Sequence, residues 1–417
     1  MFRQACLEME SAVRKQYLKV RSQLLQKRYG VSCDQGQSSR SMSIRSNSRV
    51  NTFSQISESP ENSRFPAESK TVMTPNSEQG EVVPTNQADA SRAIVGGTTI
   101  AENYAFVGVH HIFDQHTQAV TVVKFANNDR SRLCCASFDG TVSICNVTAS
   151  PPVVDVVFRG HTKGVTACDW SVSNDLMVSC SLDGTICLWD VASRRCLRVV
   201  RDQVVGAELL SCVFQPANNN MVIVGNSCGM VEVLNVSTGI YPQGGTSKLG
   251  GRVLALACES SGHLVWAGND KFDPETGRLN KGRRLNVSEN CSITCISWRA
   301  WISREARDPM LLVNCAANVV YLLRVVDKEG ALQVRRKFAI RHEHYLVRST
   351  FLSGSEDSCV YFLDIERKGK PCVNTLQGHA CPVLGVSFNY DESLLATSDY
   401  QGLVIVWKRE RRTGGAM

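Results

Sequence analysis

A serine in a glycine-rich setting is the first residue of this sequence that could do chemistry. Residues 225–229 read GNSCG and match the G-x-S-x-G pattern that presents a nucleophilic serine in hydrolases. That pattern works where a strand turns sharply into a helix, whereas strand-like residues follow Gly229. We therefore expect a turn between two strands here, and no serine hydrolase.

Three histidines and two adjacent carboxylates are the other candidates for chemistry. His110, His111 and His116 could bind a metal, but the alternation of a strand places the first two on opposite faces. Glu356 and Asp357 stand in a turn, where Asp commonly supports a hairpin. The sequence has no Walker loop and no G-x-G-x-x-G motif. We expect no catalytic residue, no metal, no cofactor and no small-molecule substrate, and we interpret the protein as a non-enzyme.

The eighteen cysteines are scattered through apolar runs, as in CCASF at residues 134–138. A buried cysteine behaves as a small hydrophobic residue. The sequence has no C-x-x-C pair, and Cys291 and Cys295 lie in an alternating, strand-like run that does not fit a zinc site. We interpret the cysteines as core residues. Because the N-terminus carries charges and no apolar run reaches about 18 residues, we expect a soluble intracellular protein without a membrane partner.

Short strand-like runs, separated by Asp, Asn and Gly turns, follow one another from residue 100 onward and repeat. The clearest unit, residues 160–190, begins with GH, turns at DG and ends with WD, and residues 378–408 follow the same pattern. Three turn glycines lie 44 and 45 residues apart: Gly140, Gly184 and Gly229. A period of about 40–45 residues with G-H and W-D marks is the signature of WD repeats.

This pattern resembles the WD-repeat β-propeller family. We count seven units, and the resemblance implies an all-β, seven-bladed propeller over residues 100–410. A blade cannot bury both of its faces alone, so blades stack around a central channel. We expect residues 103–113 to pair with the C-terminal strand and close the ring. Several segments outside the repeat marks also resemble one member of the family.

The resemblance further implies a structural hydrogen-bonded network in each complete blade. Its members are a histidine, a hydroxyl, a turn Asp and a tryptophan, in the second unit His161, Ser179, Asp183 and Trp189. In the last unit His379 and Trp407 stand at the matching positions. There Gln401 replaces the turn Asp and Asp399 is the nearest acid, so we expect an altered network.

Two of the seven units are too short for four strands. In residues 263–277 the third strand of the fourth blade is missing, and in residues 344–364 most of the second strand of the sixth blade is missing. A lost strand exposes unpaired backbone and apolar faces. We expect these two blades to be incomplete, which a splice variant or an imperfect gene model would explain.

The first 95 residues differ in composition from the rest. Residues 1–30 predict a basic amphipathic helix, and residues 31–95 predict a disordered Ser-rich linker. The helix presents six cations: Arg14, Lys15, Lys19, Arg21, Lys27 and Arg28. It could be a solvated surface helix or a short coiled coil, it could contact nucleic acid or an acidic partner, or it could bind a membrane surface. We treat the six cations as candidate interaction residues.

An inserted loop at residues 299–309 carries residue types that are common at interfaces. Its candidate interaction residues are Arg299, Trp301, Arg304 and Arg307. The alternative is that the loop packs its tryptophan against the propeller.

These features favour a protein that holds other proteins together. We expect a multi-protein scaffold in the nucleus, with the cytoplasm as a second location, linked to transcription or chromatin. The basic arm, the tail KRERR at residues 408–412 and the resemblance to a family member regarded as nuclear and regulatory lead to this expectation. The alternatives are a substrate receptor of a ubiquitin ligase, and an RNA-binding scaffold that uses the basic arm.

Overall fold

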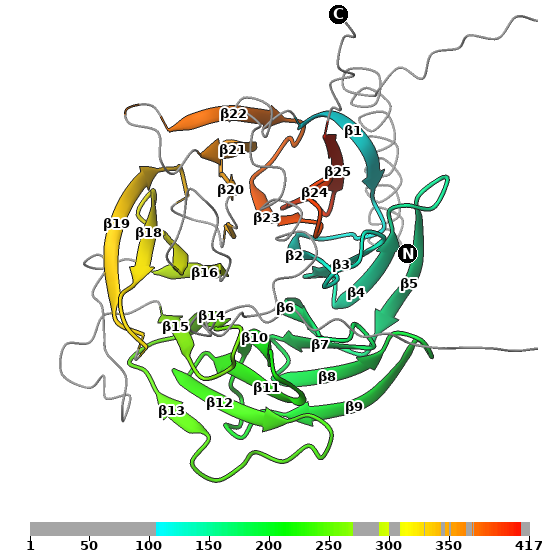
Figure 1. The fold of residues 1–417 in the computed structure, drawn as a ribbon. Helices are drawn as coiled ribbons and strands as arrows, with labels where there is room; N and C mark the ends of the chain where they lie inside the picture. The colour runs from blue at the N-terminus through cyan, green and yellow to red at the C-terminus, as the bar shows by residue number, and fades with distance from the viewer. Residues whose placement is uncertain are drawn as a thin grey trace, which may run out of the picture. The chain divides into compact units, whose positions relative to one another are not determined.

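Every regular element that the structure describes is a β-strand (Figure 1). The structure, a computed structural model, describes residues 106–269, 292–299, 309–328, 330–342, 347–349, 352–363, 369 and 371–409. The basic helix, the Ser-rich linker and most of the inserted loop therefore lie outside the described residues. The described strands form seven antiparallel sheets around a centre, which is the arrangement of a β-propeller.

Four sheets consist of four strands that follow one another in the chain. The first contains β2 (Val120–Phe125), β3 (Arg132–Ser137), β4 (Thr141–Asn146) and β5 (Val153–Arg159). The second contains β6 (Val165–Trp170), β7 (Leu176–Ser181), β8 (Thr185–Asp190) and β9 (Arg195–Arg201). The third contains β10 (Leu209–Gln215), β11 (Asn218–Asn226), β12 (Met230–Asn235) and β13 (Thr246–Lys248). The fifth contains β16 (Ile293–Arg299), β17 (Met310–Cys315), β18 (Val319–Val325) and β19 (Leu332–Ala339).

The other three sheets depart from this order. The fourth has two strands within the described residues, β14 (Val253–Cys258) and β15 (Val265–Asn269). The sixth has three, β20 (Leu352–Gly354), β21 (Cys359–Leu363) and β22 (Cys372–Gln377). The seventh combines β23 (Val383–Phe388), β24 (Leu394–Asp399) and β25 (Val404–Arg409) with β1 (Phe106–Phe113) from the other end of the chain. The sequence predicted these two sheets to be incomplete; residues 270–291, between β15 and β16, lie outside the described residues.

The hairpin turns within the sheets need glycine for two physical reasons. Gly184, between β7 and β8, has a φ of +75°, which side chains with a Cβ rarely adopt. A Cβ on Gly184 would also lie 2.7 Å from the carbonyl oxygen of Ala207, in the loop that leads to the third sheet. The glycine of this Asp-Gly turn therefore lets β7 and β8 form a tight hairpin. It also lets the loop before the next sheet approach closely.

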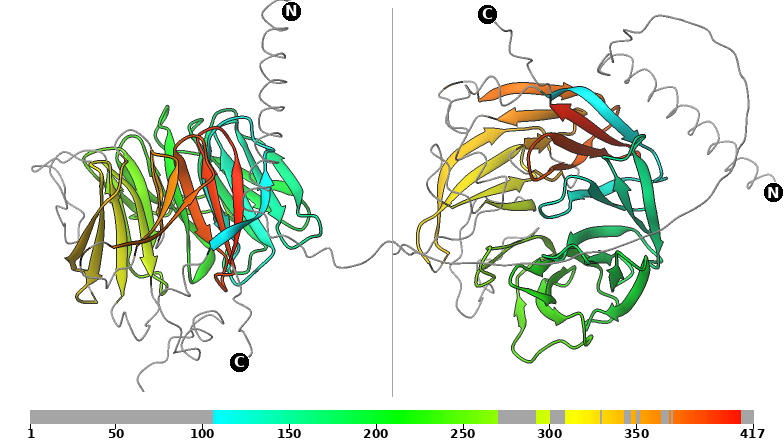
Figure 2. Two further views of the ribbon diagram at one scale, coloured as in Figure 1. Left: turned by 90° about the horizontal axis from the view of Figure 1, so that it is seen from above. Right: turned by 45° about the vertical axis from the view of Figure 1, so that its right-hand side comes forward.

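Strand β1 closes the ring by pairing with β25, and Figure 2 shows the two strands side by side. The antiparallel pairs run from Phe106 opposite Arg409 to Phe113 opposite Val404. The Phe106 ring stacks on Phe362 of the sixth sheet, with their centroids 5.8 Å apart. The predicted closing strand is thus confirmed, and closure joins residues from both ends of the propeller.

Hydroxyl groups on the first strands of four sheets and on the second strand of the seventh connect neighbouring sheets. Each donates a hydrogen bond to a backbone carbonyl on the inner segment of the next sheet. The donor, acceptor and distance are Thr121 to Val165 (2.9 Å), Thr166 to Leu209 (2.8 Å), Ser211 to Val253 (3.1 Å), Thr294 to Val347 (3.1 Å) and Ser398 to Val120 (3.0 Å). These bonds satisfy carbonyls that the strand ladders leave over, and they fix the spacing of the sheets.

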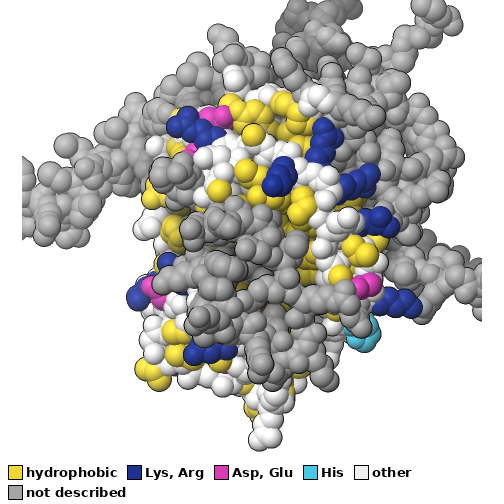
Figure 3. Space-filling view, turned by 90° about the vertical axis from the view of Figure 1, so that its left-hand side faces the viewer, with side chains coloured by type: hydrophobic (Ala, Val, Ile, Leu, Met, Phe, Trp, Pro, Cys, Tyr) yellow, Lys and Arg dark blue, Asp and Glu magenta, His cyan; other side chains and the backbone are white. Residues whose placement is uncertain are grey.

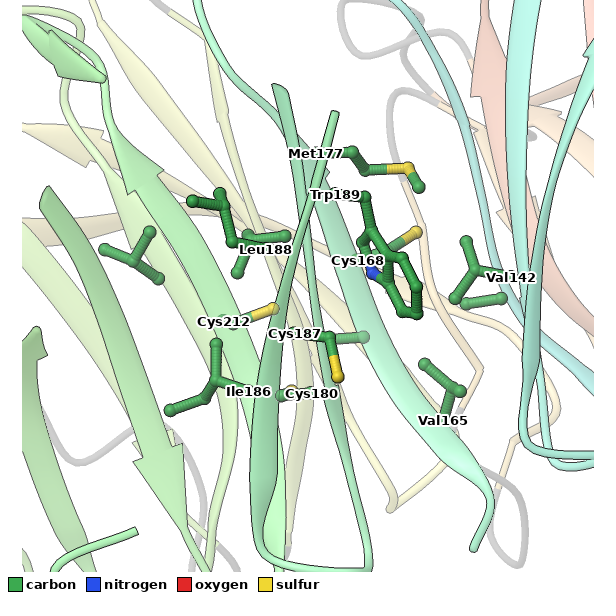
Figure 4. Close-up of a cluster of buried hydrophobic side chains, with 14 of the residues drawn as sticks. Val142, Val165, Cys168, Met177, Cys180, Ile186, Cys187, Leu188, Trp189 and Cys212 are labelled. Carbon is green, nitrogen blue, oxygen red and sulfur yellow. The ribbon is translucent and has the colours of Figure 1, made fainter. Parts of the chain in front are cut away.

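The core lies between the sheets and includes many of the cysteines. Figure 4 shows Cys168, Cys180, Cys187 and Cys212 packed among aliphatic side chains and Trp189. Burial raises the pKa of the Cys187 thiol, which keeps it protonated. The described cysteines are free thiols, and most are buried as predicted. The prediction of core residues is wrong for three exposed ones: Cys196, Cys228 and Cys372.

Candidate functional site

The second sheet contains the network that the sequence predicted for His161, Ser179, Asp183 and Trp189. His161 Nε2 lies 2.7 Å from Ser179 Oγ, and Trp189 Nε1 donates to the same oxygen at 2.8 Å. On its other side, His161 Nδ1 lies 2.9 Å from Thr185 Oγ1 and 3.4 Å from Asp183 Oδ2. Burial lowers the pKa of His161, so the ring is neutral and can accept from Ser179 while it donates to Thr185, whose hydroxyl donates in turn to Asp183.

The carboxylate of Asp183 also holds the turn. Burial acts to raise its pKa, but hydrogen bonds from Thr185 and from the Thr162 backbone hold that pKa below its ordinary value. Asp183 Oδ1 accepts from Thr185 N at 2.9 Å, and Oδ2 accepts from Thr162 N at 2.7 Å. The charged carboxylate therefore joins the histidine loop to the hairpin turn. This arrangement stabilises the sheet and offers no substrate position.

In the seventh sheet the acid of the network comes from a different position. His379 Nδ1 lies 2.9 Å from Asp399 Oδ2, and His379 Nε2 lies 2.7 Å from Thr397 Oγ1. Trp407 Nε1 donates to that same Thr397 oxygen at 2.8 Å. Asp399 also accepts the backbone N–H of Gln401 at 3.0 Å, which a turn Asp would do. The predicted alteration thus changes which residue supplies the acid and leaves the contacts in place.

The first sheet contains a similar network that sequence reasoning missed. His116 Nδ1 lies 3.0 Å from Asp139 Oδ2, and its Nε2 lies 2.8 Å from Ser143 Oγ. His116 precedes its Asp-Gly turn by almost the same number of residues as His161 precedes its own, so this spacing could have identified the network. The preceding residue is Gln115 instead of glycine, and the hydroxyl stands on β4 instead of β3. Because of these two differences, the repeat pattern did not identify this network in the sequence.

The sixth sheet has a buried histidine without a matching acid. His342 Nδ1 lies 3.1 Å from the Ile340 carbonyl, and its buried Nε2 has no hydrogen-bond partner among the described atoms. Burial lowers the pKa of His342, so the ring is neutral. Asp357, the turn acid, instead accepts a hydrogen bond from Tyr361. Among the described residues, His342 and Asp357 therefore form no hydrogen bond with each other, in a sheet whose strand β20 has three residues.

One arginine from the sixth sheet reaches across the inner strands. The segment 347–349 precedes β20, and Arg348 Nε donates to the Thr121 carbonyl at 3.2 Å. Arg348 Nη2 donates to the Thr166 carbonyl at 3.0 Å, while Arg348 N donates to the Leu384 carbonyl at 2.7 Å. Arg348 thus links the first, second and seventh sheets. Sequence reasoning did not identify it, because its partners are far away in the chain.

The residues considered for chemistry lie in turns and strands. Ser227 stands between β11 and β12, where Ser227 Oγ accepts the Glu208 N–H at 3.0 Å, so the predicted strand-to-strand turn is confirmed. Asp357 lies between β20 and β21 and accepts the Cys359 N–H at 3.1 Å. Within the described ranges, no group of three His, Cys, Asp or Glu residues could hold a metal ion. In the same residues, no helix is long and apolar enough to cross a membrane.

Most of the predicted interaction residues are not described. Arg299 is the last residue of β16, and the next described strand begins at Met310. Three other loop residues lie outside the described residues: Trp301, Arg304 and Arg307. The same holds for the cations of the basic arm: Arg14, Lys15, Lys19, Arg21, Lys27 and Arg28.

Three stretches of the chain match the family model "WD domain, G-beta repeat": residues 108–146, 154–190 and 370–408. Each stretch runs from an outer strand of one sheet through three strands of the next, which are those of the first, second and seventh sheets. In these three sheets a buried histidine contacts an acid. Within the described residues of the intervening sheets, no histidine contacts an acid in this way.

Three curated relatives show how far the similarity extends. The chain is 25% identical over 304 residues to the WD repeat-containing protein WDS homolog of Arabidopsis thaliana, which covers 70% of this chain and 56% of the relative. It is 25% identical over 314 residues to the WD repeat-containing protein 26 homolog of the same plant, covering 72% and 50%. It is 31% identical over 123 residues to Actin-interacting protein 1 of Drosophila melanogaster, covering 29% and 20%.

The chain spans 56%, 50% and 20% of the lengths of these three relatives, so the similarity concerns the repeats. Within the described residues, the sheets, the closing strand and the histidine networks agree with the matched repeats. The chain therefore contains WD repeats and folds as a β-propeller, like the WD-repeat proteins to which it is similar.

Proposed function

We propose that this chain is a non-enzymatic scaffold that holds other proteins together in the nucleus, in the regulation of transcription or chromatin. The observation that carries the proposal is the closed ring of WD repeats. Such a ring is a rigid support whose loops and outer strands face solvent, and WD-repeat propellers generally serve as protein-interaction scaffolds. Of the histidines considered for chemistry, His116 is held in the network of the first sheet, by Asp139 and Ser143.

The finer architecture is part of the same proposal. We take the two-stranded and three-stranded sheets as the fourth and sixth blades of a seven-bladed ring. A basic helix over residues 1–30 and a disordered linker over 31–95 would extend from it. The segments at 91–116, 207–220 and 301–314, among others, resemble WD repeat-containing protein 13, and this resemblance supports the nuclear and regulatory part of the proposal.

A quantitative pull-down from nuclear extract tests the proposal. Tagged full-length chain is compared with a chain that lacks residues 1–95 and keeps the whole described propeller. We expect a defined set of chromatin or transcription regulators, and loss of that set without the arm would assign the contact to the arm. Recovery of chaperonin and other folding factors alone would contradict the proposal, because it would mean that the ring does not close.

The RNA-binding alternative predicts a different result in the same experiment. Ribonuclease treatment of the extract would then remove the recovered proteins. RNA affinity of the purified chain would also fall steeply with salt, because cations that neutralise phosphates release counterions. A scaffold that binds proteins directly keeps its partners after ribonuclease treatment.

A further inference from the structure

The outer strand of the second sheet carries an unusual concentration of free positive charge. Four arginines lie on or next to β9, all of them exposed: Arg194, Arg195, Arg198 and Arg201. Residues 194–201 contain no acid. Among the described residues none of these four arginines forms an ion pair, and each guanidinium therefore keeps its charge available to a partner.

The same strand exposes two aliphatic side chains. Leu197 is 53% exposed and Val199 is 54% exposed, whereas most large hydrophobic residues of the ring are buried. Leu197 falls where the pairing of β9 with β8 shifts register, which turns its side chain out of the ladder. Exposed aliphatic groups between arginines give the strand both apolar contact area and charge.

The backbone of β9 has an open edge. β9 is the last strand of its sheet, and Asp202 N donates to the Gly184 carbonyl at 2.9 Å. Asp202 and Gly184 are therefore a hydrogen-bonded pair of the ladder. Because the two kinds of pair alternate, Arg201–Thr185 and Val199–Cys187 are non-hydrogen-bonded pairs. The N–H and C=O groups of Val199 consequently point away from β8. The Arg201 carbonyl already accepts from Tyr241 Oη at 3.3 Å, and Gly239 of the same loop lies beside the Arg198 and Val200 side chains, so the open part of the backbone edge runs from Arg195 to Val199.

The other basic outer strand, β19, uses its cations internally. The guanidinium of Arg336 lies 5.3 Å from the Phe338 ring centroid, and Lys337 Nζ lies 5.2 Å from the Tyr321 ring centroid. Arg335 Nη1 contacts the Met310 sulfur at 3.5 Å. Figure 3 shows the side of the ring that carries β19, with Lys and Arg side chains placed among hydrophobic ones. β19 is therefore a natural control for β9.

We propose that β9 is the docking edge for an extended, acidic segment of a partner protein, which adds to the second sheet as a further strand. Its backbone would pair with the open edge at Val199, and its carboxylates would meet Arg195 and Arg198. Aliphatic side chains between those carboxylates would cover Leu197 and Val199. This inference rests on the proposed function for the presence of a protein partner, and it names the surface and the chemistry of that partner.

The charge of the edge decides between possible occupants. A second copy of this chain would place arginines opposite arginines, and like charges directly opposite each other destabilise a sheet. Charged edge strands indeed protect propellers against pairing with themselves. A single-stranded nucleic acid would use the charge, but β9 has no aromatic residue for base stacking. Only an acidic extended peptide uses the charge, the aliphatic groups and the backbone edge together.

Peptide binding to the purified full-length chain tests this inference. The main probe is a fluorescent dodecapeptide of alternating Glu and Val. Two comparison probes are an alternating Lys-Val peptide and a single-stranded RNA dodecamer. A fourth probe is the Glu-Val peptide with N-methyl groups at every second residue, which removes the N–H donors of one edge without changing its charge. Fluorescence anisotropy is measured with the chain, with R195E/R198E and with the β19 control R335E/R336E.

We expect the Glu-Val peptide to bind and the Lys-Val peptide not to bind. N-methylation and R195E/R198E should each weaken binding about tenfold or more, and R335E/R336E should change it about twofold or less. V199P, which removes an outward N–H and no ladder bond, should also weaken it. Equal binding of the N-methylated peptide, or unchanged binding to R195E/R198E, would overturn the inference.

The RNA probe separates the remaining possibilities. RNA binding that R195E/R198E abolishes, in the absence of binding by the Glu-Val peptide, would assign the edge to nucleic acid and overturn the inference. The outcome is also independent of the pull-down. Failure of the peptide with an intact pull-down would contradict the docking edge alone, whereas peptide binding with no protein recovered from extract would contradict the scaffold alone.

Discussion

Ser179 shows how one hydroxyl can satisfy two buried rings. Its Oγ lies 2.7 Å from His161 Nε2 and accepts from Trp189 Nε1 at 2.8 Å. The Ser179 proton can therefore go to the histidine while the oxygen receives the indole N–H. The equivalent hydroxyl of the seventh sheet, Thr397, does the same for His379 and Trp407. A buried polar atom without a partner is costly, so the pair of contacts depends on this one group.

Replacing Ser179 by alanine removes the partner of both rings at once. We expect S179A to lower the free energy of unfolding by about 1–3 kcal/mol, the range for a buried polar group that loses its hydrogen bond. Urea unfolding followed by tryptophan fluorescence measures it. The control is Thr246→Ala, at an exposed residue of β13. Equal stability of S179A and T246A would show that the network contributes nothing.

Glu232 makes a prediction about pH. The residue is 2% exposed, and burial, with a smaller effect of the nearby Asp202, raises its pKa to about 7. Its Oε2 has no hydrogen-bond partner among the described atoms. Between pH 4.5 and 7 the unfolded chain releases this proton while the folded chain keeps it. The folded state therefore loses stability as the pH rises through this window.

Replacing Glu232 by glutamine should remove that loss. We expect E232Q to be similar to the natural chain at pH 5 and more stable by about 1–3 kcal/mol at pH 8. Urea unfolding at the two pH values measures the difference. The control is Glu208→Gln, whose side chain is partly exposed beside Arg252. A difference between E232Q and the natural chain that does not change with pH would contradict the raised pKa.

At the scale of elements, β1 makes the ring a closed structure. It supplies an outer strand to the seventh sheet, and Phe106 places its ring between Phe362 and Phe388, with centroids 5.8 and 5.7 Å away. The three rings belong to the sixth and seventh sheets and to the closing strand. Closure thus depends on packing between elements that are distant in the chain as well as on the strand ladder.

Removal of the Phe106 ring should weaken closure. The side chain is 1% exposed, and we expect F106A to lower the free energy of unfolding by about 3–5 kcal/mol, as for other buried aromatic residues. Limited proteolysis should then cleave next to β1 before the other strands. Val205→Ala, at a residue that is 99% exposed, is the control and should leave both measurements unchanged. Cleavage elsewhere first would show that another sheet is the weakest point.

At the scale of the whole molecule, Arg348 connects parts of the ring that share no strand pairing. It donates to carbonyls of Thr121 and Thr166, 227 and 182 residues away in the chain. Within the described residues, the segment 347–349 that carries it precedes β20, the first named strand of the sixth sheet. The arginine therefore links this segment to the first and second sheets.

Replacing Arg348 by methionine keeps the length of the side chain and removes its donors. We expect R348M to lower the free energy of unfolding by about 1–3 kcal/mol, because hydrogen bonds from a charged group are among the stronger ones. Hydrogen exchange should increase in β2 and β6, where the two carbonyls lie. Arg159→Met, at an exposed residue, is the matched control. Unchanged exchange in β2 and β6 would refute the role of Arg348.

The sequence alone determined the parts of this protein that depend on neighbouring residues. Strand alternation, Asp-Gly turns and the period of 44 and 45 residues identified the repeated hairpins, the closing strand and the members of the network around His161. The prediction of two shortened units has the same basis, since a missing strand changes the length of a repeat. The sixth and fourth sheets have three and two strands within the described residues.

The tertiary structure decided which distant groups meet. It placed Asp399 against His379, gave His116 a hydroxyl from β4, and brought Arg348 to Thr121. It also showed that β9 keeps its arginines unpaired while β19 engages its own cations. These outcomes depend on how blades pack around the ring. Hydrophobic patterning specifies that a face is buried, but it does not specify which polar group of another blade will stand opposite.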